Sequence, residues 1–435
     1  PAPDPREAVT TVTDSRRAEW SALLGSPVFL VLWGAMLASS TGTFFLLLTV
    51  STHLLTETDS GLTAASVFGF QWVLPVLLMG VIRRACAGER LRRTVVLCEV
   101  AGGLVSLSIG LLLDRGLLAP VLVAFLLRGL LEGITKTARV VYTRQLFDGP
   151  LLKPASYTFN NSYYLGGALG GGLGAVLVDR VPITTACAID AATFLVSACC
   201  YRWLPAVTAP RSGTDGKRGV LGQVRAAARE NPRLALSAGY FVVAVGVFQG
   251  YHNVARTTVP IRVLGLGDAA AMTLQLVSGV GLVAGAVAAP LLLQRVRAPR
   301  YLAAATNAAT ALAISVVPLA GGPIVMYGCY FAYLAVFEFS FTAAQAAMIQ
   351  DCPPDRLLAL TTFTNAAGNG LLILVTLAVG ALSDVASFET ITLALAAAAV
   401  GGTAVGEVLT ARRTAPRNTT KPPAPAVSPE QGAEM

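Results

Sequence analysis

Charged residues are scarce in this 435-residue chain: Asp, Glu, Lys and Arg make up only 13% of it, whereas hydrophobic residues make up 54%. A soluble domain typically carries about 25% charged residues, so the composition argues against an ordinary soluble fold. The mean hydropathy of +0.65 agrees with that exclusion. Lysine occurs at only four positions and histidine at two, which leaves few side chains for acid–base chemistry.

The motifs of several function classes are missing too. The seven cysteines show no C-x-x-C spacing, and His53 and His252 lie far apart, so neither a zinc site nor a disulfide framework is expected. No Gly-rich phosphate-binding loop occurs, so we expect no cofactor and no ATP-driven transport by this chain alone. No nucleophile–base pair or metal cluster stands beside an apolar run, and an integral-membrane enzyme is therefore set aside.

What the chain has instead is about twelve apolar stretches of roughly 20 residues each. A helix of that length crosses a hydrocarbon layer about 30 Å thick. The pattern predicts an all-α integral membrane protein with twelve transmembrane helices, which we place at residues 28–50, 62–82, 94–113, 117–138, 155–178, 182–203, 234–255, 269–293, 301–319, 323–349, 359–381 and 388–410.

Positive charge alternates between the loops that join these stretches. The loops at 83–93, 136–153, 202–233 and 295–300 are basic, whereas the intervening loops hold acids and only four bases, Arg115, Arg180, Arg256 and Arg262. Basic loops stay cytoplasmic, so both termini are predicted to be inside, in an inner (plasma) membrane. Topology and anionic lipid also explain most of the net charge of +8, so no nucleic-acid partner is expected.

The longest internal loop, 204–233, divides the chain into two halves. It contains Pro, Ser and Gly residues, and its second half, Arg218 to Glu230, could form a short interfacial helix. We therefore predict the following organisation: an N-terminal cytoplasmic segment 1–27, a six-helix bundle 28–203, a cytoplasmic linker 204–233, a second six-helix bundle 234–410 and a disordered tail 411–435.

The two halves resemble one another around the fifth and eleventh spans. An offset of 204 residues superposes Thr158 on Thr362, Phe159 on Phe363, Asn161 on Asn365 and Gly166 on Gly370. Internal duplication is the build of many secondary transporters, whose substrate site lies at the membrane midplane between the repeats. The pattern predicts two pseudo-symmetric halves around a central site.

Two segments of the first half follow the motifs of a known transporter family. FLLRGLLEG from Phe125 resembles the fourth-helix Arg motif of the major facilitator superfamily, with Arg128 one place farther from Gly133 than is usual. The basic segment GVIRRACAGERLRR has the length of that family's signature loop but carries Arg84 near the place of the expected Asp. The departure puts the usual charge relay at this loop in doubt.

Two further segments resemble the exporters of that superfamily. In YYLGGALGGGLGAVL, Gly166, Gly170 and Gly174 hold the spacing of the fifth-helix glycine motif of drug/proton antiporters, although Gly171 stands where proline is usual. AIDAATFLVSA from Ala188 is similar to the sixth helix of the subgroup that includes siderophore and macrolide efflux proteins. Small residues at this spacing let helices approach closely, so we expect these three glycines to serve helix packing and rocking.

Glu338 is the first candidate for proton coupling. It lies near the middle of the tenth span among Tyr and Phe residues, with no base within several turns. A neutral carboxyl is cheaper to bury than a carboxylate, so the group can hold a proton until a cation or water reaches it. The alternative is a glutamate hydrogen-bonded to a neighbouring helix.

Arg128 and Glu132 form the second candidate, because their i, i+4 spacing places them on one helical face. The resemblance implies that the fourth helix lines the cavity, where such a pair could exchange protons and substrate; the alternative is a static ion pair. Asp190 and Glu99 are expected to be structural, the latter reaching toward the inner surface.

The remaining candidates are polar groups on spans expected to line the cavity. Asn161 and Asn365 are candidate hydrogen-bond partners for a substrate, and Tyr330 belongs to the aromatic stripe before Glu338. Gln249 and His252 lie toward the outer end of the seventh span. A histidine there can titrate near neutrality, although a polar anchor at the membrane interface is the plainer explanation.

These features predict a proton-coupled exporter of a small amphiphilic molecule, a drug or natural product, that works as a monomer by alternating access. The excess of acids inside the membrane favours a cationic or zwitterionic substrate. An importer or a lipid-handling facilitator on the same fold is the alternative. No metal or nucleic-acid partner is expected.

Overall fold

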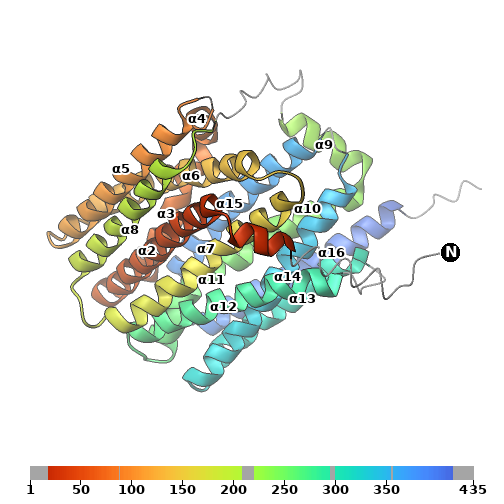
Figure 1. Cartoon of the computed structure of the whole chain (residues 1–435). Coiled ribbons are helices and arrows are strands. Elements are labelled where there is room, and N and C mark those ends of the chain that lie inside the picture. Colours follow the sequence, from red (N-terminus) through yellow and green to blue (C-terminus); the bar gives the residue numbers. More distant parts are fainter. Residues whose placement is uncertain (1–17, 88, 208–219, 294–298, 354–355, 415–435) are drawn as a thin grey trace, which may run out of the picture.

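The computed structural model describes residues 18–87, 89–207, 220–293, 299–353 and 356–414, and within these ranges the regular structure is entirely helical (Figure 1). Long helices run side by side in a bundle, as the apolar runs predict. The predicted terminal segment 1–27 and tail 411–435 lie mostly outside the described residues.

The helices before the linker form one group, which we call the N-terminal group. Ser26 caps the first of them by accepting from the Phe29 amide, and Ser60 caps the second by accepting from the Thr63 amide. The second span is bent by 70° at Leu78, three residues after Pro75. Its elements are α2 (Pro27–Thr58), α3 (Gly61–Leu77), α4 (Met79–Ala85), α5 (Leu91–Leu113), α6 (Leu118–Leu146), α7 (Gly149–Leu177) and α8 (Ile183–Trp203).

The helices after the linker form the C-terminal group. Its first span is a single run of helix, Pro232–Val263, in which two π-helical segments flank a stretch of α-helix. Asn231 caps that run by accepting from the amides of Arg233 and Leu234. The elements are α10 (Pro232–Val243), η1 (Ala244–Phe248), α11 (Gln249–Thr258), η2 (Val259–Val263), α12 (Asp268–Leu293), α13 (Pro299–Val316), η3 (Val317–Leu319), α14 (Pro323–Asp351), α15 (Leu357–Leu382) and α16 (Phe388–Thr414).

Ten of the described helices are long and apolar enough to cross a membrane, and the bent pair α3–α4 makes an eleventh span. Twelve spans were predicted. The remaining one corresponds to α7, which has 29 residues but is not among the apolar spans. Its asparagines, tyrosines and seven glycines lower its hydropathy. Such residues suit α7, because it packs against α2 of its own group and α12 of the other instead of facing mainly lipid.

Each group has its own apolar core, and the groups meet along two pairs of helices. Clusters of buried residues such as Phe29 and Tyr142 hold the N-terminal group together, and a cluster around Tyr251, Tyr330 and Tyr333 holds the C-terminal group. Between the groups, α3 packs against α15 and α7 packs against α12. Figure 1 shows the helices lying roughly parallel in both groups.

Several helix ends differ from the predicted ones. The fourth span extends to Leu146 instead of 138, and the seventh extends to Val263 instead of 255. Lys136, Arg139 and Arg256 therefore lie inside helices and not in loops. The helix predicted in the linker is confirmed as α9 (Val220–Glu230), with residues 208–219 outside the described ranges.

Candidate functional site

A small pocket lies where the two groups meet, and we call it the junction pocket. Polar side chains of α3, α11 and α12 line it together with aromatic side chains of α2, α3 and α7. Its volume is about 30 Å³, room for a water-sized group. Its lining residues are Phe44, Gln71, Trp72, Tyr163, Tyr164, Gly167, Gln249, His252, Asn253, Arg256, Gln275 and Leu282.

The seventh span presents four polar residues to this pocket, because positions 249, 252, 253 and 256 share one face of the regular α-helix α11, which two π-helical segments flank. Gln249 and His252 are among the lining residues, as is Arg256, which the sequence analysis assigned to a loop. Nδ1 of His252 lies 2.8 Å from the Tyr330 hydroxyl. Tyr330 itself does not line the pocket but is buried in the core of the C-terminal group.

Arg256 is 2% exposed and has only neutral partners. Its Nη1 donates to Gln275 Oε1 at 3.0 Å and its Nη2 donates to Asn253 Oδ1 at 3.1 Å. The guanidinium carbon lies 3.7 Å from the centroid of the Phe68 ring, which belongs to α3 of the other group. A cation therefore lies at the contact between the two groups.

The predicted pair of Arg128 with Glu132 is wrong. Arg128 is fully buried inside the N-terminal group, where its Nη2 lies 2.9 Å from Asp190 Oδ2 and 3.1 Å from Thr43 Oγ1. Ser106 donates to the same Asp190 oxygen at 2.7 Å. The long Arg side chain reaches α8 instead of the next turn of its own helix, because the buried carboxylate of Asp190 needs a counter-charge there.

Glu132 pairs instead with Lys136, one turn farther along α6, at 2.9 Å. The Lys136 ammonium also lies 4.6 Å from the Trp72 ring centroid and 4.3 Å from the Tyr163 ring centroid. Both aromatic residues line the junction pocket, and Lys136 is 28% exposed. The ion pair of α6 that lies next to the lining of the junction pocket is thus Glu132–Lys136.

Glu99 also differs from its expected placement. It is fully buried and lies 3.8 Å from Arg139 of α6, so it does not extend toward the inner surface. Arg139 donates through Nε to the Tyr201 hydroxyl at 3.2 Å. The fourth helix therefore supplies a positive partner to an acid at three levels: Arg128, Lys136 and Arg139.

Removal of Asp190 should test the structural importance of the deepest pair. Asp190→Ala leaves the Arg128 guanidinium buried without a counter-charge, which costs about 3–5 kcal/mol. We expect a large drop in the melting temperature of the purified protein. The double variant Arg128→Met/Asp190→Ala should recover most of the loss. Equal melting of the single variant and the wild type would show that the pair contributes nothing to stability.

Glu338 of α14 is 2% exposed and lies close to the contact between the groups. The hydroxyls of Thr342, on its own helix, and of Tyr164, on α7, lie beside its carboxyl. Its Oε2 is buried without a hydrogen-bond partner, and no ion pair joins it to any described residue. An acid of the C-terminal group thus contacts a side chain of the N-terminal group that lines the junction pocket.

The glycines of α7 face two different helices. Gly166 and Gly170 lie against Ser40 and Thr41 of α2, inside the N-terminal group. Gly171 and Gly174 lie against Met272 of α12, across the contact between the groups. In the motif, Gly166 and Gly170 therefore face α2 and Gly174 faces α12. Gly171, at the place of the usual proline, lies closest to the backbone of α12.

The two groups are also joined by ions at one end of the bundle, which we call the latched end. Arg262 of η2 lies 2.9 Å from Asp384 and 3.1 Å from Asp59. Asp384 also accepts from the amides of Gly61 and Leu62 at the start of α3, at 2.6 and 3.2 Å. A carboxylate from one group thus caps a helix of the other, where the helix dipole favours it.

Neutralising Asp384 should weaken the latch. Burial alone would raise the pKa of Asp384, but the bonds from the Gly61 amide and Arg262 outweigh burial and hold that pKa below its usual value. The latch is therefore complete at neutral pH and weakens only in acid, as the pH falls through this low pKa. We expect Asp384→Asn to lengthen the distance between spin labels at Arg115 and Val385, which are exposed at this end. An unchanged distance would mean that apolar packing alone closes the end.

The predicted asparagines do not meet at the junction pocket. Asn161 is half-buried on α7 with its Oδ1 unpaired, and Asn365 is exposed on α15. Neither is among the residues that line the pocket. Their roles as cavity hydrogen-bond partners stay predictions.

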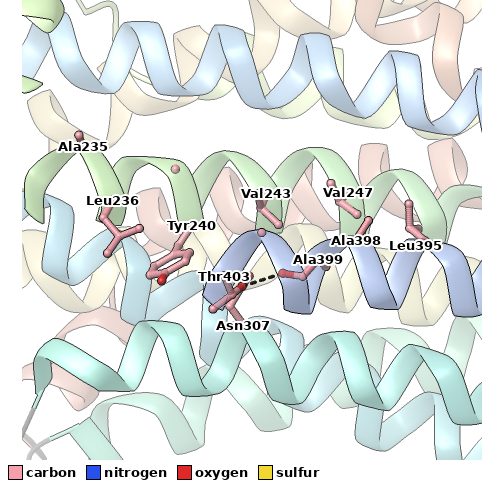
Figure 2. Close-up of a pocket in the computed structure, with 12 residues that line it drawn as sticks. Ala235, Leu236, Tyr240, Val243, Val247, Asn307, Leu395, Ala398, Ala399 and Thr403 are labelled. Carbon is pink, nitrogen blue, oxygen red and sulfur yellow. Dashed lines mark hydrogen bonds between the residues drawn. The ribbon is translucent and has the colours of Figure 1, made fainter. Parts of the chain in front are cut away.

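A second, larger pocket of about 310 Å³ lies within the C-terminal group, between α10, α13 and α16. Figure 2 shows its lining of Leu, Val and Ala side chains, with the Thr403 hydroxyl bonded to the Ala399 carbonyl oxygen. Asn307 Nδ2 also donates to Thr403 Oγ1 at 2.8 Å. It holds none of the predicted site residues. An apolar groove of this kind offers no group for binding a charge or moving a proton.

Sequence reasoning missed Lys136, Arg256 and Gln275. The first two were counted with the loops: the predicted seventh span ended at 255, just before Arg256, and the basic loop 136–153 overlapped the end of the predicted fourth span at Lys136. The i, i+4 spacing of Glu132 and Lys136 was a usable signal. For Arg256 the sequence showed only the i, i+3 spacing with Asn253, since its other partners, Gln275 and Phe68, come from α12 and α3.

The chain matches the model of the Major Facilitator Superfamily over residues 85–376. No curated protein matches it. A mutant of the nucleoside transporter NupG has a similar structure, with a TM-score of 0.71, 13% identity and coverage of 88% of this chain and 99% of that one.

Two other solved structures are similar. For an inward-facing, unoccupied bacterial homologue of the human lysosomal transporter Spinster, the TM-score is 0.65 at 13% identity, covering 89% of this chain and 96% of that one. The same TM-score and coverages, at 11% identity, hold for a POT family transporter in complex with a thioalcohol-conjugated peptide. At such identities the likeness shows the fold alone. The family match spans well over half of the sequence, and the chain belongs to the Major Facilitator Superfamily: it is a multi-pass membrane transporter of small molecules, not an enzyme.

Proposed function

We propose that this transporter is a proton-coupled exporter of a small amphiphilic molecule, a drug or natural product, and that it works by alternating access of the two groups of helices. The observation that carries the proposal is Glu338, a buried acid with no counter-ion in the described part of the chain, placed beside Tyr164 of the opposite group. An intramembrane acid of this kind is suited to taking up and releasing a proton. Proton exchange there would change a contact between the two groups directly.

The direction of transport and the orientation in the membrane rest on sequence. The glycine motif of α7 and the sixth-helix resemblance support export. The charge alternation of the loops supports cytoplasmic termini in the plasma membrane, so that the latched end faces outward. In that orientation the structure is closed to the outside, and Tyr157, Lys136 and Asn365 are accessible from the inner side.

The mechanism follows from these placements. Protons from outside would reach Glu338 once the latched end opens. The neutral, protonated carboxyl of Glu338 would then be buried at lower cost when the two groups close around it. After closure, substrate from the inner side would bind near Trp72 and Tyr163, and proton release would accompany loading. Each ligand stabilises the conformation in which the other leaves, as reciprocal coupling requires.

An importer on the same fold is the second candidate. The four side-chain amides of the junction pocket, those of Gln71, Gln249, Asn253 and Gln275, support it, because they suit a hydrogen-bonding substrate. The apolar groove between α10, α13 and α16 supports a lipid-handling facilitator in the same way.

Accumulation of toxic compounds in cells with and without the gene tests the proposal. An exporter lowers accumulation of its substrate, and a protonophore abolishes the difference. Higher accumulation in cells that carry the gene would favour the importer. A difference that survives the protonophore would contradict proton coupling.

The orientation has its own test. We expect a single cysteine at Arg225, on the linker helix α9, to react with a membrane-impermeant thiol reagent in broken cells only, in a variant whose native cysteines are replaced by alanine. A cysteine at Val385 should react in intact cells. The reverse pattern would contradict cytoplasmic termini.

A further inference from the structure

Among the described residues, the ion pairs of the helix interiors lie in the N-terminal group. Asp190 pairs with Arg128, Glu132 pairs with Lys136 and Glu99 lies near Arg139. In the C-terminal group, among the described residues, Arg256 has no acidic partner. The junction pocket therefore has one positive charge that the protein itself does not neutralise.

Neutral contacts do not repay the burial of this cation. A charge taken out of water costs several kcal/mol unless an opposite charge meets it. The ring of Phe68 offsets about 0.5–2 kcal/mol of that cost, and the oxygens of Gln275 and Asn253 each supply one hydrogen bond. The Nε–H of Arg256 has no partner. An arrangement of this kind fits a site that an anion completes.

The surroundings of Arg256 also fix its geometry in advance. Gln275 holds one end of the guanidinium and Asn253 holds another, while Phe68 covers one face. A planar guanidinium held in this way matches a carboxylate with two parallel hydrogen bonds. Trp72 and Tyr163 of the same pocket offer flat apolar surfaces next to it.

We propose that the junction pocket binds the acidic group of the transported molecule on Arg256, so that the substrate is an aromatic carboxylate or a zwitterion with such a group. This inference rests on the proposed function and narrows its substrate class. The pocket has room only for a small group in the closed arrangement. The carboxylate therefore occupies the pocket, and the rest of the molecule extends toward Trp72, Lys136 and the unlatched end.

Binding of matched ligands to the purified full-length protein tests the proposal. The probes are 2-naphthoate and indole-3-acetate, each compared with its primary amide, which keeps the shape and lacks the charge. For wild type we expect at least one carboxylate to bind at least about tenfold more tightly than its amide. Arg256→Gln should weaken binding of that carboxylate about tenfold to a hundredfold, the range of a charge-assisted hydrogen bond, and leave the amide unchanged.

The control is Arg115→Gln, which removes an exposed positive charge at the latched end and should bind like wild type. Without ligand, Arg256→Gln should melt no lower than wild type, because an unpaired buried charge is lost. Equal binding of carboxylates and amides, absence of carboxylate binding, full affinity in Arg256→Gln, or its early melting would each overturn the proposal. None of these outcomes depends on a proton gradient, so failure here and failure of proton coupling are distinguishable.

Discussion

Glu338→Gln should abolish gradient-driven transport while leaving substrate binding measurable. Glutamine keeps the shape of the side chain and its hydrogen-bonding capacity beside Tyr164 and Thr342, but it cannot take up or release a proton. Coupling should fail while the pocket survives. The measurement is flux into liposomes that contain the purified protein, with an imposed pH gradient and a substrate identified by the cell assay.

Glu407→Gln is the matched control. Glu407 is a carboxylate of the same group that accepts from the Tyr240 hydroxyl at 2.8 Å, away from the contact between the groups. Its replacement should leave gradient-driven flux within about twofold of wild type, the scale of a modest hydrogen-bond effect. If Glu338→Gln pumps at the wild-type rate, Glu338 is structural, and Glu132 with Lys136 becomes the next candidate for coupling.

Gly171→Ala should block transport at normal expression. A Cβ at this position would lie 2.6 Å from the Leu276 amide nitrogen and 2.8 Å from the Met272 carbonyl oxygen, both backbone atoms of α12. Such overpacking typically costs about 1–3 kcal/mol, or a tenfold to hundredfold change in the ratio of two states. Since the clash lies between the groups and not within one of them, it should destabilise the arrangement closed at the latched end and spare the fold.

Gly172→Ala provides the control on the same helix. A Cβ there would be 3.7 Å from its nearest neighbour, a methyl carbon of Leu276, an ordinary contact. Both substitutions change helix propensity equally, so only the interface differs. We expect Gly172→Ala to transport normally and Gly171→Ala to show a longer distance between labels at Arg115 and Val385. Equal transport by both variants would mean that α7 and α12 can separate without cost.

Hydropathy and charge were sufficient to predict the helical membrane fold, because each span must be apolar whatever its neighbours are. They also predicted the span at 155–178, which is confirmed as the helix α7 although its glycines and asparagines keep its hydropathy low. They placed the ends of α6 and of the seventh span too early. The predicted spans ended at 138, two residues after Lys136, and at 255, just before Arg256, whereas the helices run on to Leu146 and Val263. Both residues continue their helices because partners elsewhere in the bundle receive their side chains.

The candidate site shows the same limit. Glu338 could be selected from sequence, since an acid with no base within several turns is visible along one helix. The partner of Arg128 could not, because Asp190 lies on another helix and the i, i+4 spacing pointed to Glu132. Arg256 became a site residue only when Gln275, Phe68 and Trp72 were placed around it. Contacts between helices decide the chemistry, and a single sequence carries no direct record of them.

The distance between spin labels at Arg115 and Val385, followed from pH 5 to pH 9 in wild type and Glu338→Gln, tests proton-coupled alternation most directly. Asp384 stays ionised over this range because its pKa is held low, so the latch itself does not titrate. We predict that the populations of short and long distances shift with pH in wild type and stay constant in Glu338→Gln. The same pH-dependent shift in both proteins would contradict a coupling role for Glu338.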